Sequence, residues 1–289
     1  MRGSNGASYA CPPVRSDATW GDDRIMTLTR MRRRGALALA AGILLLLGVP
    51  LYQDGVLART GYLEATNAIA THHQFGPYLL WASAHPVLDA SYRAVQLVVF
   101  LLALGLPGVL RRILWPGDPT GGRLGMWAGQ TGFAVYALTL ILGIATTPAT
   151  ASAYAHTVAG RADAVSGYLT LFAVRTALSN VLGGGLIALF LVLMSLRGTS
   201  SGRMPGWLAY LGLATGGLLG ASAIMFLFAL TDPNTALSPL AFFGLAFWFI
   251  ALGLLLLRIQ ERPREEAVAA AENGPSATPT PARESDPRG

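Results

Sequence analysis

Six apolar runs, each about as long as a bilayer is thick, constrain this chain more than any other feature. Hydrocarbon offers the backbone no hydrogen bonds, so a run of about 20 apolar residues crosses a membrane as an α-helix. Charged residues make up only 12% of the chain, against about 25% in a typical soluble protein. The sequence therefore predicts an all-α polytopic membrane protein, a six-transmembrane-helix bundle. The runs are residues 35–51, 91–110, 126–147, 175–197, 207–230 and 237–257.

The arginines predict the orientation of the bundle. All 21 basic residues are arginine, and short cytoplasmic loops of membrane proteins are enriched in basic residues. With the N-terminus inside, the inner segments hold 17 arginines, and the outer segments hold only Arg59, Arg93, Arg161 and Arg175. We therefore expect an N-in/C-in topology. Membrane topology also accounts for the net charge of +6, so no nucleic-acid partner is predicted.

Polar segments flank the membrane domain, which we place at residues 30–258. Residues 1–29 have no apolar periodicity, and residues 259–289 are rich in Ala, Pro, Glu and Ser. Both segments are predicted to be disordered and cytoplasmic, because such compositions bury too little apolar surface to fold. The start site is left open between Met1, Met26 and Met31.

The first run has the form of a signal peptide as well as of a membrane span. Four arginines lie between residues 30 and 34, and Val56-Leu57-Ala58 would serve as a cleavage site. The run is long for the apolar core of a signal peptide, so we expect it to be retained as a span.

Two long segments are predicted to connect spans on the outer side. Residues 58–88 are polar and aromatic. Residues 149–174 follow Thr146-Thr147-Pro148, where we expect the third helix to stop, and from Gly167 they are apolar enough to begin the fourth helix early. On the inner side, Gly105-Leu106-Pro107-Gly108 should kink the end of the second helix.

Small residues four positions apart predict close helix packing. In lipid such residues let backbones approach, which replaces the hydrophobic drive for helix association. We expect seams among the third, fourth and fifth helices. The seam residues are Gly125 and Gly129, Ser179 and Gly183, and Gly212, Gly216 and Gly220.

Polar residues near the outer end of the fourth helix mark the candidate site. Arg175 lies about 33 Å from Arg197 at the helical rise, which places it at the outer interface, where the default interpretation is a snorkelling anchor. Asn180 lies about 7 Å deeper, where the default is an interhelical hydrogen bond. The functional interpretation places both in an outward-facing pocket. The pocket candidates are Arg175, Asn180, Asp89, Arg93, His85 and His156, with Asp89 and Arg93 spaced as a helix ion pair.

The sequence predicts no cofactor and no catalytic motif. His72, His73, His85 and His156 all fall toward the outer side. Histidine and carboxylate ligands suit zinc, but no two of these histidines have the i, i+4 spacing within a span that would place two ligands on one helix face. No phosphate loop, GxSxG or HExxH motif occurs, and no carboxylate lies at a span centre, where an acid relay for proton-driven transport would need one.

The opening of the fifth helix carries a family resemblance. Met204-Pro205-Gly206-Trp207-Leu208 precedes a glycine-rich span, after a long fourth helix that ends in Arg197-Gly198. Over about residues 30–258 the chain resembles uncharacterised six-span bacterial integral membrane proteins, grouped as a domain-of-unknown-function family. That resemblance implies a multi-pass protein of the bacterial inner membrane and no established activity.

Three classes of function stay open at this point. The main hypothesis is a binding, sensory or accessory membrane component, with the lipid bilayer and a small molecule or membrane protein as partners. The alternative is a small transporter or permease subunit, which requires a path across the third to fifth helices. The third is an enzyme that uses the outer histidines, which requires them to converge.

The arginine distribution generates a first prediction. A reporter fused after Arg258 should be active on the cytoplasmic side, because an even number of spans returns the chain to the side on which it began. A paired fusion after Arg161 should report the opposite side. A periplasmic signal from the Arg258 fusion would contradict the N-in/C-in topology.

Overall fold

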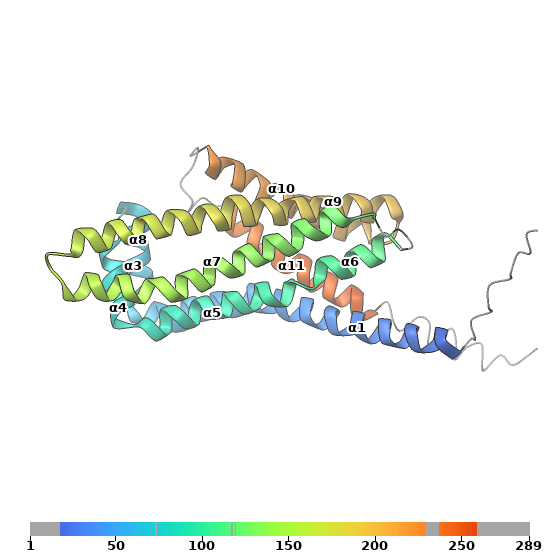
Figure 1. Ribbon diagram of the computed structural model, residues 1–289, viewed down its shortest axis with the longest axis horizontal. Coiled ribbons are helices and arrows are strands. Elements are labelled where there is room, and N and C mark those ends of the chain that lie inside the picture. The colour runs from blue at the N-terminus through green and yellow to red at the C-terminus, as the bar shows by residue number, and fades with distance from the viewer. Residues whose placement is uncertain (1–17, 73, 117, 119, 229–236, 259–289) are drawn as a thin grey trace, which may run out of the picture.

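The computed structural model describes residues 18–72, 74–116, 118, 120–228 and 237–258, and every regular element in that part of the chain is helical. Six segments are long and apolar enough to cross a membrane. The predicted all-α, six-span architecture is therefore confirmed, and the apolar helices indicate an integral multi-pass membrane protein. Figure 1 shows the long helices running along the long axis of the molecule.

The first two spans are built from several helical pieces. Span 1 (Met31–Thr60) consists of α1 (Ala18–Ile43), η1 (Leu44–Gly48), α2 (Val49–Tyr52), η2 (Gln53–Leu57) and η3 (Ala58–Thr60), where η1 and η2 are π-helical. Two short helices follow, α3 (Tyr62–His72) and α4 (Gly76–Ala84). Span 2 (Pro86–Leu114) is α5 (Pro86–Ala103) and α6 (Leu106–Leu114), interrupted at Leu104-Gly105, where the glycine-proline motif predicts a kink.

The remaining spans are more continuous. Span 3 is α7 (Arg123–His156), and span 4 (Arg161–Ser201) joins α8 (Arg161–Thr176), the π-helical η4 (Ala177–Gly184) and α9 (Gly185–Ser201). Spans 5 and 6 are α10 (Gly206–Leu227) and α11 (Leu237–Arg258).

The two ends of the bundle differ in chemistry. At the cap end, α3 packs on α4, and α4 packs on α5, on α7 and, through Tyr78 and Tyr168, on α8 (Figure 1, left). These packed segments form what we call the cap. At the arginine end lie the start of α1, α6 and the loop that joins α9 to α10 (Figure 1, right). The arginine end is defined by Arg34, Arg111, Arg112, Arg197 and Arg203.

Two apolar cores stabilise these regions. The bundle core is aromatic at its centre, with Phe133, Phe190, Trp248 and Phe249 fully buried. The cap has a separate core of Leu57, Ala65, Tyr78, Leu79, Trp81, Ala82, Ala151 and Tyr168. The cap is therefore a packed structure in its own right, although its sequence reads as polar loops.

The outer surface of the bundle is apolar. Leu101, Leu138, Leu182 and Phe247 are each between 45% and 52% exposed. A soluble protein rarely exposes apolar side chains on every face, whereas helices that contact lipid tails do so. The lipid bilayer is thus a natural partner of this surface.

Glycines permit close approach at the helix contacts. On α10, a Cβ atom at Gly216 would lie 3.1 Å from the Ala188 carbonyl oxygen of α9, and one at Gly220 would lie 3.7 Å from the Ala188 Cβ. A Cβ at Gly212 would lie 2.2 Å from the Ser195 hydroxyl. These three glycines therefore face α9 closely.

The third and fourth helices meet in the same way. A Cβ at Gly129 would lie 2.8 Å from the Phe190 ring, and one at Gly183 would lie 2.8 Å from the Tyr136 ring. Gly125 approaches the Met194 side chain, with a Cβ position 3.0 Å away. Ser179 differs, because it lines a cavity and donates its hydroxyl to the Thr176 carbonyl.

Several predicted boundaries are wrong. α1 begins at Ala18, so residues 18–29 of the predicted disordered leader are helical. No proline lies between residue 18 and the start of the first apolar run, and a helix once formed extends readily. Residues 1–17 and 259–289 lie outside the described residues. α7 continues past Pro148 to His156, because neighbouring helices and threonine hydroxyls can compensate for a proline in a membrane helix.

The predicted loop at 149–174 is mostly helix. α8 starts at Arg161, so only the turn at 157–160 separates α7 from α8. Apolar contacts inside the cap, among them those of Ala151 and Tyr168, stabilise these extensions beyond the apolar runs. The fifth span ends at Leu227 instead of Leu230, and residues 229–236 lie outside the described part.

The contact between α1 and α11 generates a second prediction. A Cβ atom at Gly253 would lie 2.7 Å from the Leu39 nitrogen and 2.8 Å from the Gly35 carbonyl oxygen. Backbone atoms cannot rotate away, so Gly253→Ala should destabilise the protein by about 1–3 kcal/mol, as overpacking does. Thermal melting in detergent measures this. Gly217→Ala is the matched control, because nothing lies within 4 Å of its Cβ position; equal melting of the two variants would contradict the prediction.

Candidate functional site

A cavity of about 500 Å³ lies among five of the six spans, at the boundary between the bundle and the cap. Its lining is mixed, with two arginines, several amides and hydroxyls, and a set of aliphatic and aromatic side chains. The lining residues are Leu45, Val49, Pro50, Gln53, Tyr92, Arg93, Gln96, Phe100, Tyr136, Thr139, Leu140, Arg175, Thr176, Ser179, Asn180, Ser238, Pro239, Phe242 and Phe243. A volume of this size suits a small-molecule ligand.

Irregular helix turns form two walls of the cavity. The π-helical segments η1 and η2 of span 1 contribute Leu45 and Gln53, and η4 of span 4 contributes Ser179 and Asn180. Pro50 lies between η1 and η2 and has no N–H to donate, which favours a local change of helix pitch. π-Helical turns are rare and occur frequently at functional sites.

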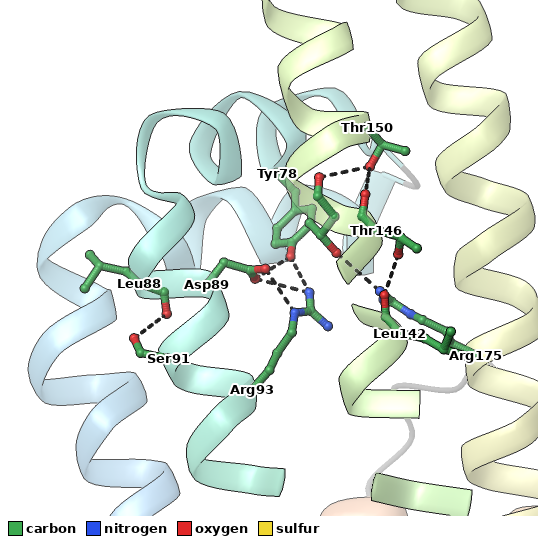
Figure 2. A network of polar contacts seen from close by, with 10 residues as sticks. Tyr78, Leu88, Asp89, Ser91, Arg93, Leu142, Thr146, Thr150 and Arg175 are labelled. Carbon is green, nitrogen blue, oxygen red and sulfur yellow. Dashed lines mark hydrogen bonds and ion pairs between the residues drawn. The ribbon is translucent and has the colours of Figure 1, made fainter. Parts of the chain in front are cut away.

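A buried ion pair lies at the cap side of the cavity. The Arg93 Nε donates to the Asp89 Oδ2 at 3.0 Å, and its Nη2 donates to the Asp89 Oδ1 at 3.1 Å. The Tyr78 hydroxyl donates to the Asp89 Oδ1 at 2.7 Å and accepts from the Arg93 Nη2 at 2.6 Å. Figure 2 shows these three side chains closing a ring between α4 and α5. The predicted i, i+4 pair of Asp89 and Arg93 is confirmed.

Burial makes this ring more than an ordinary helix ion pair. The side chains of Arg93 and Asp89 are 15% and 4% exposed. Burial also raises the pKa of the Tyr78 phenol well above its ordinary value, so the hydroxyl keeps its proton and can donate to the carboxylate. A buried charge pair with satisfied hydrogen bonds is costly to break, because either partner alone leaves an uncompensated charge.

Arg175 has no such partner among the described residues. It is 9% exposed, and its Nη1 donates to the Thr147 hydroxyl of α7 at 3.3 Å. Its guanidinium lies 5.9 Å from the centroid of the Tyr168 ring. Arg93–Asp89 is the one ion pair within the described part of the chain. Among the described residues, Arg175 is therefore a buried cation whose partners are neutral, namely the Thr147 hydroxyl and the Tyr168 side chain.

The two arginines converge on one point. A Cβ atom at Gly143 of α7 would lie 2.7 Å from the Arg93 Nη1 and 3.0 Å from the Arg175 Nη1. Two like charges about 6 Å apart repel by roughly 3 kcal/mol at an effective dielectric constant near 20. Asp89 compensates one of them, so an excess positive charge remains beside the cavity. An anion bound there would relieve that repulsion.

An aromatic layer closes the cavity toward the arginine end. Phe100 stacks on Tyr136 with ring centroids 4.6 Å apart, and Tyr136 contacts Phe242 edge to face at 5.8 Å. Below them, Phe133 packs against Phe249 at 5.8 Å. Phe100, Phe133 and Phe249 are each at most 3% exposed. The cavity thus ends at a packed floor instead of continuing along the bundle.

The structure brings together four of the six predicted pocket residues. Arg93, Arg175 and Asn180 line the cavity, and Asp89 lies directly behind Arg93. Two default interpretations are wrong. Arg175 does not snorkel to solvent, because α8 continues to Arg161 and the cap covers it. Asn180 has no interhelical hydrogen bond among the described residues and faces the cavity instead.

The histidines lie apart from the cavity. His85 precedes α5 without a side-chain capping hydrogen bond and stacks on Trp81 at 5.5 Å. His156 ends α7, exposed, with its Nδ1 2.9 Å from the Ser152 carbonyl oxygen. His72 is exposed at the end of α3, and His73 lies outside the described residues. No group of three histidine, cysteine or acidic residues that could hold a metal ion occurs in the described ranges.

Sequence reasoning missed several residues of the site. Tyr78 completes the ion pair from a segment that reads as a loop, and Gln53, whose Oε1 accepts from the Tyr92 hydroxyl at 2.9 Å, comes from beyond the first apolar run. Ser238 and Pro239 line the cavity from the start of α11. Pro50 could have indicated this part of the site, because a proline inside an apolar run predicts an irregular helix that packs against neighbouring helices.

Comparisons with known proteins add no relative. No family model, no curated protein sequence and no solved structure matches the chain.

The buried ion pair generates a third prediction. Asp89→Asn should destabilise the protein by about 3–5 kcal/mol, because it leaves Arg93 buried without its counter-charge. Asp163→Asn is the matched control, since Asp163 is exposed in the first turn of α8. Thermal unfolding in detergent measures both. Equal melting temperatures for the two variants would show that the ring does not stabilise the fold.

Proposed function

We propose that this chain binds a small amphipathic anion in the cavity between the bundle and the cap. The main support for this proposal is Arg175, whose buried guanidinium faces the cavity and has no carboxylate partner among the described residues. Membrane proteins rarely bury an ionisable group without a function, because the charge is costly away from water. A bound carboxylate, sulfonate or phosphate would supply the missing counter-charge.

The apolar body of the proposed ligand is inferred from the rest of the cavity lining. Arg93, Arg175, Asn180 and nearby amides and hydroxyls occupy part of the wall, and Leu45, Val49 and Phe242 occupy another part. A ligand with an acidic head and an apolar body satisfies both parts. Arginine also matches the planar geometry of a carboxylate, to which it donates two parallel hydrogen bonds.

Binding is favoured over transport by the aromatic floor. A transporter in this conformation would need a polar route from the cavity to the arginine end, and Phe100, Phe133 and Phe249 occupy that space. We therefore propose a binding, sensory or accessory component, with the cavity facing outward. The bacterial inner membrane and membership of the uncharacterised six-span family remain part of this proposal, supported by the arginine distribution and the fifth-helix motif.

The fourth prediction tests the acidic head. Decanoate should stabilise the purified protein against thermal unfolding, whereas decanol, which has the same chain without the charge, should bind far more weakly. Arg175→Gln should lower decanoate affinity about ten-fold or more, because a hydrogen bond to a charged group contributes about 1.5–3 kcal/mol. Isothermal titration in detergent measures the affinities.

Two further variants sharpen the result. Arg161→Gln removes an exposed arginine that lies over the Tyr154 ring, so decanoate affinity should not change. Gly143→Ala keeps both charges but adds a Cβ against the two guanidinium groups, and it should weaken decanoate binding. Equal affinity for decanoate and decanol, or full affinity in Arg175→Gln, would refute the proposed ligand class.

A further inference from the structure

A second cavity, of about 610 Å³, lies at the arginine end between α1, α6 and α7. It is separate from the cavity beneath the cap and shares no lining residue with it. Four of its lining residues are arginines, and none is acidic. The lining residues are Met31, Arg33, Arg34, Leu37, Gly105, Gly108, Val109, Arg111, Arg112, Met126 and Gln130.

The interruption of span 2 gives this cavity its shape. α5 ends at Ala103 and α6 begins at Leu106, so Gly105 lies at the junction. A Cβ atom at Gly105 would lie 1.8 Å from the Arg34 Nη1 and 2.4 Å from its Cζ. The Arg34 guanidinium therefore occupies the space that any other residue at position 105 would need. The kink and the glycine together bring an arginine of α1 against span 2.

Three of the four cavity arginines form no ion pair with the described residues. Arg33, Arg34 and Arg112 have no carboxylate within 4.0 Å in the part of the chain that the structure describes. Arg111 donates its Nε to the Gly121 carbonyl at 2.9 Å. The nearby Asp118 carboxylate is held by its own loop, where N–H groups of Gly121 and Thr120 donate to it and lower its pKa, and the Arg111 charge lowers that pKa further. An anionic group is the complementary ligand.

An apolar groove adjoins the basic cavity on the lipid-facing surface. Gln130 lines both, so the two are contiguous. The groove, about 460 Å³, is lined by Leu104, Trp127, Gln130, Thr131, Ala134, Val135 and Leu138. Trp127 and Leu138 are 61% and 49% exposed. Tryptophan is enriched where membrane helices meet the headgroup region, so this arrangement places a basic cavity above a groove that faces the lipid tails.

We propose that the arginine end binds one anionic phospholipid, with its phosphodiester in the basic cavity and an acyl chain in the shallow groove along α7 beside Leu104. Basic pockets between membrane helices bind acidic headgroups through charge and hydrogen bonds. A free phosphate would satisfy the arginines but leave the groove unused. The shared Gln130 connects the two halves of the site, which is why a lipid fits better than a soluble anion.

Lipid retention is the test of this site. The protein is reconstituted in vesicles of equal amounts of phosphatidylglycerol and phosphatidylcholine and then extracted in detergent. It should retain more phosphatidylglycerol than phosphatidylcholine, and native mass spectrometry counts the bound lipids of each kind. The double variant Arg34→Gln with Arg112→Gln should retain about thirty-fold less, given roughly 1 kcal/mol for each of the two basic residues near an anionic headgroup. Arg203→Gln is the matched control, because Arg203 donates to the Ile113 carbonyl at 3.1 Å and does not line the cavity.

Two variants test the site without altering its charge. Gly105→Ala should displace the flexible Arg34 side chain and reduce retention. Gly217→Ala on α10 should not, because it lies outside the site and nothing is within 4 Å of its Cβ position. Ala134→Trp should fill the exposed groove and reduce retention as well.

Three results would overturn the proposal. The first is equal phosphatidylglycerol retention by the wild type and the double arginine variant. The second is an equal loss in Arg203→Gln, which would indicate a diffuse surface effect. The third is displacement of the lipid by excess inorganic phosphate, which would assign the cavity to a soluble anion. Arg175→Gln should retain the lipid normally, so failure at this site and failure at the cap-side cavity are distinguishable.

Discussion

The ring formed by Asp89, Arg93 and Tyr78 is the interaction on which the cap end of the molecule depends. Asp89 and Arg93 belong to α5, which crosses the membrane, and Tyr78 belongs to α4, which does not. The ring therefore fixes the cap to the bundle through charged and polar groups that are almost fully buried. It also engages the Asp89 carboxylate, and Arg175 forms no ion pair with any carboxylate of the described residues. Stability of the cap and the unpaired charge of the cavity thus have the same origin.

The geometry of the cavity depends equally on helix irregularity. A regular α-helix places side chains every 100° or so around its axis, and a π-helical turn shifts that register. In span 1 the shift surrounds Pro50, and in span 4 it coincides with Ser179 and Asn180. Gly183 allows the Tyr136 ring to pack directly against the widened helix, with a Cβ position only 2.8 Å from the ring. The floor and walls are therefore set by the same departures from α-helical geometry.

The sequence was sufficient for the architecture and for part of the site. Apolar runs located all six spans, because the hydrocarbon thickness dictates their length, and the Asp89–Arg93 spacing predicted their ion pair. The burial of Arg175 could not be predicted in this way. The helical distance from Arg197 places Arg175 at the membrane–water interface. That estimate assumes that water lies beyond the outer end of the apolar run, whereas the cap occupies that space. Tyr78 and Gln53 were missed for the same reason, since the cap is built from segments whose composition alone resembles loops.

The two arginine clusters illustrate how the same side chain serves opposite ends of a membrane protein. At the cap end, two buried guanidinium groups converge on Gly143 and only Arg93 is paired with a described carboxylate, which selects for a ligand that brings a single negative charge. At the arginine end, four line an open cavity beside an apolar groove, which selects for a headgroup that stays at the interface. Phe100, Phe133 and Phe249 separate the clusters. That aromatic layer packs α5, α7 and α11 together, so a ligand at one end of the bundle can influence the other end only by moving whole helices. Lipid bound at the arginine end would oppose such movement, because it would hold α1 and α6 against α7.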